Sequence, residues 1–396
     1  MTDLAATHRR LVDLGLRRAT LLVDPARARA NIARFADRAR NSGVTLRPHF
    51  KTHQSADVAT WFTEANVACA TVSSLGQAAY FADHGWRDLT LAIGLNPREL
   101  PEVAALARRV ALGVTVDHLG QVASLAEAAA PVGVWVEVDT GAGRAGVDAS
   151  DPGSAAALLR AIERAPTLAY RGLLTHAGHS YGARPHEAAT IHQASCAALA
   201  GLREHLRAAG LPGGLLSAGD TPGFAAVESW TGLDEARPGN FVFHDLMQLA
   251  SGVCSERDLA CAVAAPVIGV YPDQRRVVVH AGAVHLSKDA LQRPEGPMYG
   301  RLLTMNATGF DRLADEGVLV SLSQEHGTVA LASEGTTRAY EPGDLVLIAP
   351  VHSCLTCEQF GSYLTVAGER LARYVSASSS RPDSASRASG GRTNEV

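Results

Sequence analysis

The feature that most constrains the fold is an alternation of short β-rich runs with longer alanine-rich runs over the first two thirds of the chain. The β-rich runs predict strands at residues 20–24, 44–50, 69–72, 89–93, 113–116, 132–138, 170–176, 214–217 and 241–243. The clearest predicted helices between them are 25–40, 101–109, 155–164 and 186–209. Such alternation is typical of a parallel sheet, and about eight units favour a TIM-like (β/α)8 barrel over an open sheet.

From about residue 260 the pattern changes to short strands joined by turns, which predicts a smaller, mainly antiparallel β domain. Its strands are expected at 261–270, 276–279, 319–323, 328–331, 345–349 and 363–366. We therefore expect a barrel over residues 20–250 and a β domain over 251–375, with residues 1–19 packing on the β domain. The Ser-, Arg- and Gly-rich end, 376–396, predicts a disordered tail.

Composition excludes several classes of partner. The formal net charge of −4 and the pI near 6.4 give no basic surface for nucleic acid or for an anionic membrane. No apolar stretch is long enough to cross a bilayer, and the N-terminus lacks a signal-peptide pattern, so we expect a cytoplasmic protein. The six cysteines are irregularly spaced, which argues against a disulfide framework and makes a functional cysteine a ligand or nucleophile.

Lys51 is the first candidate catalytic residue. It lies in RPHFKTH (residues 47–53), directly after an apolar strand, at the barrel end where catalytic groups collect. Apolar and cationic neighbours disfavour its ammonium form, which suits an amine that must react with an aldehyde. An ordinary lysine at a strand exit is the alternative, although the chain has only one other lysine, Lys288.

Three further polar segments follow predicted strands. SAGDTPG (217–223) can aim backbone N–H groups at an anion, with RPGN (237–240) as an opposing wall, although a plain loop fits equally well. EVDTGAGRAG (137–146) lets the backbone turn sharply and project Arg144 toward an anionic or phenolate oxygen. HAGHSY (176–181) ends another strand. All four segments should share one face of the barrel.

His352 and Cys354 predict a metal site in the β domain. In extended backbone, residues two apart point to the same side, so the two side chains can bind one ion. An imidazole with a thiolate favours zinc, and two protein ligands leave positions open for water or substrate. A redox-active pair of Cys354 with Cys357 and a buried histidine beside two core cysteines are the alternatives.

Taken together, these segments resemble the fold-type III pyridoxal-phosphate enzymes, in particular the D-serine dehydratase and D-threonine aldolase family. The resemblance runs from about residue 20 to 373 through TLLVDPARARAN, PHFKTH, EVDTGAGRAG, HAGHSY, SAGDTP and HSCLT, in that order. It implies an alanine-racemase-like barrel followed by a β domain, as a homodimer with sites at the interface.

The resemblance also implies roles for individual residues. Lys51 would form the Schiff base with pyridoxal 5′-phosphate, and Arg144 and Tyr181 would contact its ring or O3′. The implied phosphate-binding residues are Ser217, Gly219, Thr221, Gly239 and Asn240. His352 and Cys354 would bind Zn2+, with Mn2+ or another divalent ion as the alternative; in this family a His-x-Cys pair resembles the zinc dehydratases and His-x-Asp the aldolases.

The implied reaction is elimination of the β-hydroxyl from a D-β-hydroxy amino acid such as D-serine, giving a 2-oxo acid and ammonia. Retro-aldol cleavage to glycine and an aldehyde is the nearest alternative. A non-catalytic pyridoxal-phosphate carrier is an alternative of another class, which the β domain and the His-x-Cys pair argue against. A racemase would need a second base that the sequence does not identify.

Overall fold

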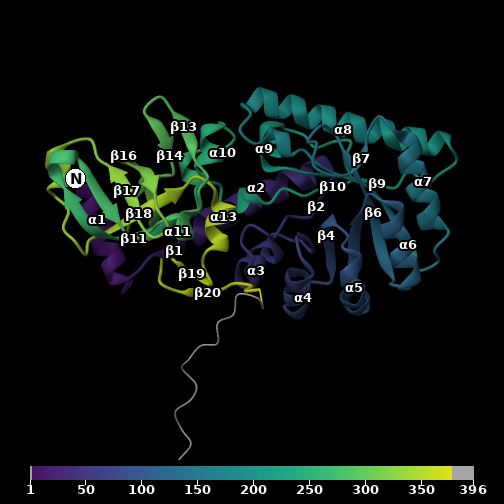
Figure 1. Cartoon of the computed structure of the whole chain (residues 1–396), viewed down its shortest axis with the longest axis horizontal. Coiled ribbons are helices and arrows are strands. Elements are labelled where there is room, and N and C mark those ends of the chain that lie inside the picture. Colours follow the sequence, from purple (N-terminus) through teal and green to yellow (C-terminus); the bar gives the residue numbers. More distant parts are fainter. Residues whose placement is uncertain (1, 377–396) are drawn as a thin grey trace, which may run out of the picture.

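A computed structural model describes residues 2–376 and has two parts, a parallel barrel and an antiparallel β domain, which lie side by side in Figure 1. The disordered tail predicted at the C-terminus falls, from residue 377 on, outside the described residues. No helix among residues 2–376 is long and apolar enough to span a bilayer. The predicted fold class is confirmed.

The barrel strands follow one another in the order β2-β10-β9-β8-β6-β5-β4-β3. A parallel bridge between His49 and Thr71 joins the two ends of this order and nearly closes the barrel. The strands are β2 (Thr45–Leu46), β3 (Cys69–Val72), β4 (Asp88–Gly94), β5 (Ala111–Val116), β6 (Val132–Asp139), β8 (Leu168–His176), β9 (Leu215–Gly219) and β10 (Glu235–Ala236), with β7 (Val147–Asp148) paired to β6.

Helices cover the outside of the barrel (Figure 1). They are α2 (Pro25–Ser42), α3 (Ala56–Glu64), α4 (Leu75–Asp83), α5 (Leu100–Ala107), α6 (Leu119–Glu127), α7 (Pro152–Glu163), α8 (Pro185–Ala208) and the short α9 (Thr221–Ala226). The short α10 (Leu246–Ala250) lies at the β domain, where Met247 N donates to Val351 O at 3.1 Å. The sequence sets the bounds of α2: Asp24 Oδ1 accepts from two backbone N–H groups of its first turn, Pro25 opens it, and Gly43 ends it at φ 68°.

The β domain is built on a nine-stranded sheet. Its members are β1 (Thr20–Val23), β11 (Cys261–Tyr271), β12 (Arg276–Val279), β15 (Gly300–Asn306), β16 (Gly309–Leu322), β17 (Gly327–Ala330), β18 (Leu345–Pro350), β19 (Ser362–Thr365) and β20 (Arg370–Ala372). A hairpin of β13 (Leu291–Arg293) and β14 (Gly296–Met298), and the short helices α11 (Ala283–Leu286), α12 (Glu334–Thr337) and α13 (Ser353–Glu358), complete it.

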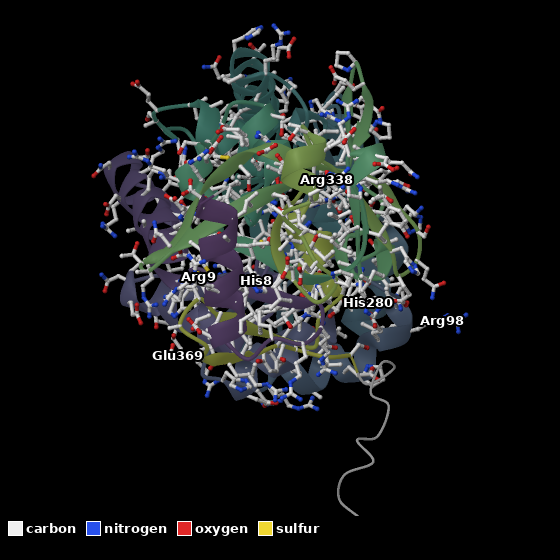
Figure 2. All side chains as sticks on the ribbon, turned by 90° about the vertical axis from the view of Figure 1, so that its left-hand side faces the viewer. His8, Arg9, Arg98, His280, Arg338 and Glu369 are labelled. Carbon is white, nitrogen blue, oxygen red and sulfur yellow. The ribbon has the colours of Figure 1, made fainter. Side chains whose placement is uncertain are left out.

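Helix α1 (Thr2–Asp13) packs against β15 and β18, where the sequence analysis expects residues 1–19. Thr7 Oγ1 accepts from Met305 N at 2.8 Å, and Leu11 is fully buried against the sheet. Seen from the β-domain end, α1 lies across this face and carries His8 and Arg9 (Figure 2).

Two strand predictions differ from the structure. The strand expected at 20–24 forms as β1, but it pairs antiparallel with β11 and parallel with β19 instead of joining the barrel. The strand expected at 241–243 is a 3-10 helix, Asn240–Val242, whose aromatic and valine side chains fill the core. An apolar run of three residues is compatible with either conformation, and the tertiary packing decides.

Candidate active site

A cavity of about 390 Å³ lies at the carboxyl ends of the barrel strands. Of the predicted site residues, the structure brings six to its lining: Lys51, Arg144, Tyr181, Gly239, Asn240 and Cys354. A connected outer pocket of about 480 Å³ shares Lys51, Arg144, His176, Tyr181 and Cys354 with it and adds His352. The barrel and the β domain therefore both contribute to one site.

Lys51 lies in a tight turn after β2, in which Gln54 N donates to Phe50 O at 2.8 Å. Its side chain is exposed toward the cavity, but protein atoms surround the cavity closely. Desolvation by these surroundings, with the nearby charges of Arg144 and Arg237, lowers the pKa of Lys51, while Cys354 opposes the shift. The amine is thus closer to its neutral, nucleophilic form than a surface lysine.

Two histidines beside Lys51 are held neutral. Burial and the neighbouring cations lower the pKa of His176 to about 3 and that of His49 well below its usual value. His176 Nδ1 bonds to Gly219 O, so it carries the proton and leaves Nε2 as an acceptor. His49 Nδ1 accepts from Lys51 N at 3.3 Å, so its proton lies on Nε2.

Arg144 lies in the glycine-rich loop between β6 and β7. A Cβ at Gly146, whose φ is 105°, would lie 2.7 Å from Asp139 N, so the chain needs glycine there to fold back on β6. The Arg144 guanidinium pairs with Glu137 Oε1 at 3.7 Å and remains more than half exposed. Its free face is available to an anionic group in the cavity.

The predicted phosphate-binding residues fall into two sets: Gly239 and Asn240 line the cavity, whereas Ser217, Gly219 and Thr221 do not. Thr221 opens α9, and its Oγ1 is buried without a hydrogen-bond partner among the described residues. Asn240 lines the cavity, but its Nδ2 is engaged by Asp245 Oδ2 at 2.7 Å and Ser353 Oγ at 2.9 Å. Ser217 lies beneath the cavity, where Arg237 Nε donates to its Oγ at 2.8 Å.

Tyr181 follows a 3-10 turn, Gly178–Ser180, at the end of β8. Burial, Cys354 and Asp220 raise the pKa of its phenol, so the hydroxyl stays protonated. Its oxygen accepts from Thr221 N at 3.5 Å, which links HAGHSY to SAGDTP across two strands.

His352 and Cys354 meet at the start of α13. His352 is the residue before this helix and Cys354 lies in its first turn, so the extended backbone assumed from the sequence is wrong for Cys354. The side chains nevertheless lie close enough to interact, since Cys354 opposes the effect of burial and raises the pKa of His352. Burial disfavours the thiolate, but His352, Thr52 and Lys51 together lower the pKa of Cys354. Among residues 2–376, no third His, Cys, Asp or Glu joins them in a metal-binding group.

Cys357 belongs to the core and not to this pair. It is fully buried in the same cluster as Cys261 and Tyr363, and it raises the pKa of both groups. Its partner is therefore not Cys354, which gives no support to the redox-pair alternative.

Comparison with known proteins decides the family. Residues 23–246 match the alanine racemase N-terminal domain, and 260–366 match a putative serine dehydratase domain. The D-threo-3-hydroxyaspartate dehydratase of Delftia sp. is 34% identical, over 88% of this chain and 93% of the relative. The chain belongs to the fold-type III pyridoxal-phosphate enzymes of the D-serine dehydratase and D-threonine aldolase family.

Further relatives agree with this assignment. The D-serine dehydratase of Dictyostelium discoideum is 26% identical over 87% of this chain and 91% of the relative. The solved Delftia dehydratase superposes with a TM-score of 0.84 at 33% identity, covering 91% of this chain and 98% of that one. The chain is thus a pyridoxal-phosphate-dependent lyase and not the non-catalytic carrier.

The residues present fit the cofactor that this family uses. Lys51 supplies an amine with a lowered pKa, and Thr221 supplies a buried hydroxyl that lacks a partner within residues 2–376. The neutral His49 and His176 line the cavity together with Lys51, and Thr221 adjoins it through the contact of its N–H with Tyr181 Oη. A phosphate oxygen would give the Thr221 hydroxyl an acceptor.

The donors of His352 and Cys354 also fit a metal ion. Asp289 Oδ2 lies 2.6 Å from His352 Nδ1, which leaves Nε2 for a ligand position. Nitrogen and sulfur donors suit zinc better than magnesium or calcium. A solved cysteine-to-alanine variant of a D-threo-3-hydroxyaspartate dehydratase, 33% identical to this chain, is a metal-free form.

The sequence patterns did not indicate a separate role for Arg237, and they gave no sign of Asp289. Arg237 is fully buried under the cavity, and burial lowers its pKa to about 10. An arginine at the start of RPGN could have indicated a cation near the site. Asp289 lies 63 positions before His352, in a loop with no motif, so nothing local indicates the contact.

Proposed function

We propose that this enzyme is a dehydratase that removes the β-hydroxyl of a D-β-hydroxy amino acid and yields a 2-oxo acid and ammonia. We further propose that it uses pyridoxal phosphate on Lys51 and Zn2+ on His352 and Cys354. The dehydratases among its relatives act on D-threo-3-hydroxyaspartate and D-serine by name, which supports this substrate class.

The observation that carries the proposal is that Lys51 and the His352–Cys354 pair line the same outer pocket. Cys354 Sγ also contacts Thr52 Oγ1 at 3.2 Å, one residue from Lys51. An elimination needs a base at Cα and an acid at the β-oxygen of one small molecule. This pocket places candidates for both within reach of such a molecule.

On the cofactor side, bound pyridoxal phosphate supplies an electron sink for the charge that develops at Cα. Lys51 then serves as the base, because its lowered pKa favours the neutral amine, whose Nζ can accept the Cα proton. Thr221, Gly219, Gly239 and Asn240 are proposed to line the phosphate site, with Ser217 supporting it through Arg237. Arg144 and Tyr181 are proposed to contact the ring or its O3′.

On the β-domain side, zinc held by His352 and Cys354 would supply a Lewis acid for the β-hydroxyl, a poor leaving group when unassisted. Asp289 fixes the orientation of the His352 imidazole. Thr52 and Asn240 contact Cys354 Sγ at 3.2 and 3.6 Å and hold the sulfur toward the cavity.

We also propose a cytoplasmic homodimer with the site at its interface. Ile93 lines the cavity yet is 53% exposed, and Leu355 lines the outer pocket yet is 40% exposed, so a second subunit would cover apolar side chains at the mouth. All six cysteines are free, as expected in a reducing compartment.

The decisive experiment incubates the holoenzyme with D- and L-forms of serine, threonine and 3-hydroxyaspartate. Separate assays measure 2-oxo acid, ammonia, glycine and aldehyde. We expect 2-oxo acid and ammonia in equal amounts from D-forms alone. Glycine and acetaldehyde from D-threonine, without 2-oxo acid, would make the enzyme an aldolase.

A further inference from the structure

Two turns of the barrel are built alike. Residues 73–77 (SSLGQ) follow β3 and residues 117–121 (DHLGQ) follow β5, and each leads into a helix whose third residue is glutamine. Gln77 Oε1 accepts from Ser73 N at 3.1 Å, and Gln121 Oε1 accepts from Asp117 N at 2.9 Å. Because a backbone N–H can donate only to the amide oxygen, these bonds fix which way each amide faces.

The two amide nitrogens have different surroundings. Gln121 Nε2 donates to Leu95 O at 3.1 Å, so this glutamine is fully used in joining two loops. Gln77 Nε2 donates to no group within the described residues, although the side chain is only 6% exposed. Gln77 lines the outer pocket with Lys51, His352 and Cys354. This donor is therefore available to a ligand in the outer pocket.

The position of Gln77 indicates which part of a ligand it meets. The residues that line the outer pocket but not the inner cavity are Gln54, Gln77, Gly178, His352, Leu355 and Glu358. Gln54 and Glu358 bond to each other, and Glu358 also pairs with Arg373 at 2.7 Å. Gly178 and Leu355 offer no polar side-chain group. Apart from His352, Gln77 is therefore the lining residue of this set with an uncommitted donor.

We propose that Gln77 Nε2 binds a carboxylate carried on the β-carbon of the substrate, and so selects 3-hydroxyaspartate-type dicarboxylic substrates over D-serine. This rests on the proposed function, which places the substituents of the β-carbon beside His352 and Cys354. D-serine has no group there to accept the hydrogen bond. A carboxylate accepts it strongly because the acceptor is charged.

The first test compares Gln77→Glu with the matched control Gln121→Glu. Gln77→Glu keeps an oxygen that accepts from Ser73 but replaces the donor with an anion. The ratio of kcat/KM for D-threo-3-hydroxyaspartate to that for D-serine should fall about 10- to 100-fold in Gln77→Glu. It should not change in Gln121→Glu, which alters the contact with Leu95. An unchanged ratio in Gln77→Glu would overturn the proposal.

A binding test separates this inference from the proposed reaction. D-aspartate and D-alanine lack a β-hydroxyl, so neither can be dehydrated, and their binding can be followed by the absorbance of the bound cofactor. The wild-type enzyme should prefer D-aspartate, and Gln77→Met, which removes the donor without adding charge, should lose that preference. If the wild-type enzyme prefers D-aspartate to D-alanine but shows no dehydratase activity, only the proposed function is rejected. If the wild-type enzyme binds D-aspartate and D-alanine with equal affinity, only the role of Gln77 is rejected.

Discussion

The barrel half and the β-domain half of the site are assembled in different ways. In the barrel, Lys51, Arg144 and Tyr181 follow three different strands and meet at one cavity because the barrel closes. In the β domain, His352 and Cys354 come from one turn after β18. The first half depends on the global topology, whereas the second is one local turn, which Asp289 orients at His352 and which Thr52 and Asn240 contact at Cys354.

The two halves are also tied together, most clearly at two places. The turn that carries Lys51 belongs to the barrel by sequence, yet the β domain holds it: Tyr363 Oη donates to His53 O at 2.8 Å, and Tyr374 N donates to Gln54 O at 2.6 Å. Asn240 of the barrel donates to Ser353 Oγ and contacts Cys354 Sγ. Changes in the two halves should therefore have separate effects, except at this turn and at Asn240.

The largest effect should come from the barrel half, at Lys51. Lys51→Ala removes both the covalent attachment of the cofactor and the base, so turnover should fall by more than about 10⁴-fold. The aldehyde should no longer be trapped on the protein by borohydride, while zinc content stays near the wild-type value. A Lys51→Ala enzyme with undiminished turnover would refute the site as a whole.

The next largest effect should come from the metal half. Cys354→Ala, or chelation of the wild-type enzyme, should cost about 10³-fold in turnover because a Lewis acid supplies several kcal/mol. The fold and cofactor absorbance should persist, and added zinc should restore only the chelated wild type. Cys357→Ala is the control: it should keep its metal and lose about 1–3 kcal/mol of stability from the core. Equal metal loss in both variants would contradict the assignment.

A smaller effect is expected at Asp289, which touches only the metal half. Asp289→Ala frees the His352 imidazole to rotate, so zinc affinity should fall about 10- to 100-fold. Cofactor binding should not change. Zinc titration followed by activity measures the shift, and wild-type affinity in the variant would mean that Asp289 does not orient the ligand.

The smallest effect concerns pH and belongs to the barrel half. Burial lowers the pKa of His192 to about 4 and that of His53 and His244 to about 3. The unfolded chain then binds more protons below pH 6.5, so the free energy of unfolding should fall from pH 6.5 toward pH 3. His192→Gln should flatten this dependence by up to one proton, about 1.4 kcal/mol per pH unit, in urea unfolding of the apoprotein between pH 4 and 6.5. An unchanged slope would show that His192 is not protonated on unfolding.

The sequence was a better guide to the barrel than to the β domain. Alternating runs predicted the barrel, and polar segments after its strands predicted five residues that line the cavity. The sequence did not predict β15, β20 or the hairpin of β13 and β14, because short strands without regular alternation resemble loops. The sequence correctly predicted that His352 and Cys354 lie together. It predicted an extended backbone there, whereas the structure has the start of a helix.

Some contacts lie beyond what local patterns can indicate. Asp289, Tyr363 and Gln77 act through hydrogen bonds whose geometry depends on the tertiary fold. The domain bounds at 20–250 and 251–375 stay predictions. The boundary between residues 250 and 251 falls at the end of α10. At the other end of the predicted barrel, β1 lies in the sheet of the β domain.

The place of β1 has a consequence for biosynthesis. Thr20–Val23 is translated about 240 residues before its partner β11 and still longer before β19. Because the ribosome adds about 5–20 residues per second, this strand stays unpaired at both edges for roughly 10–50 s. An apolar strand exposed in this way invites pairing with another chain. The nascent protein should depend on ribosome-associated chaperones during this interval, and slow codons in the barrel should lower its soluble yield.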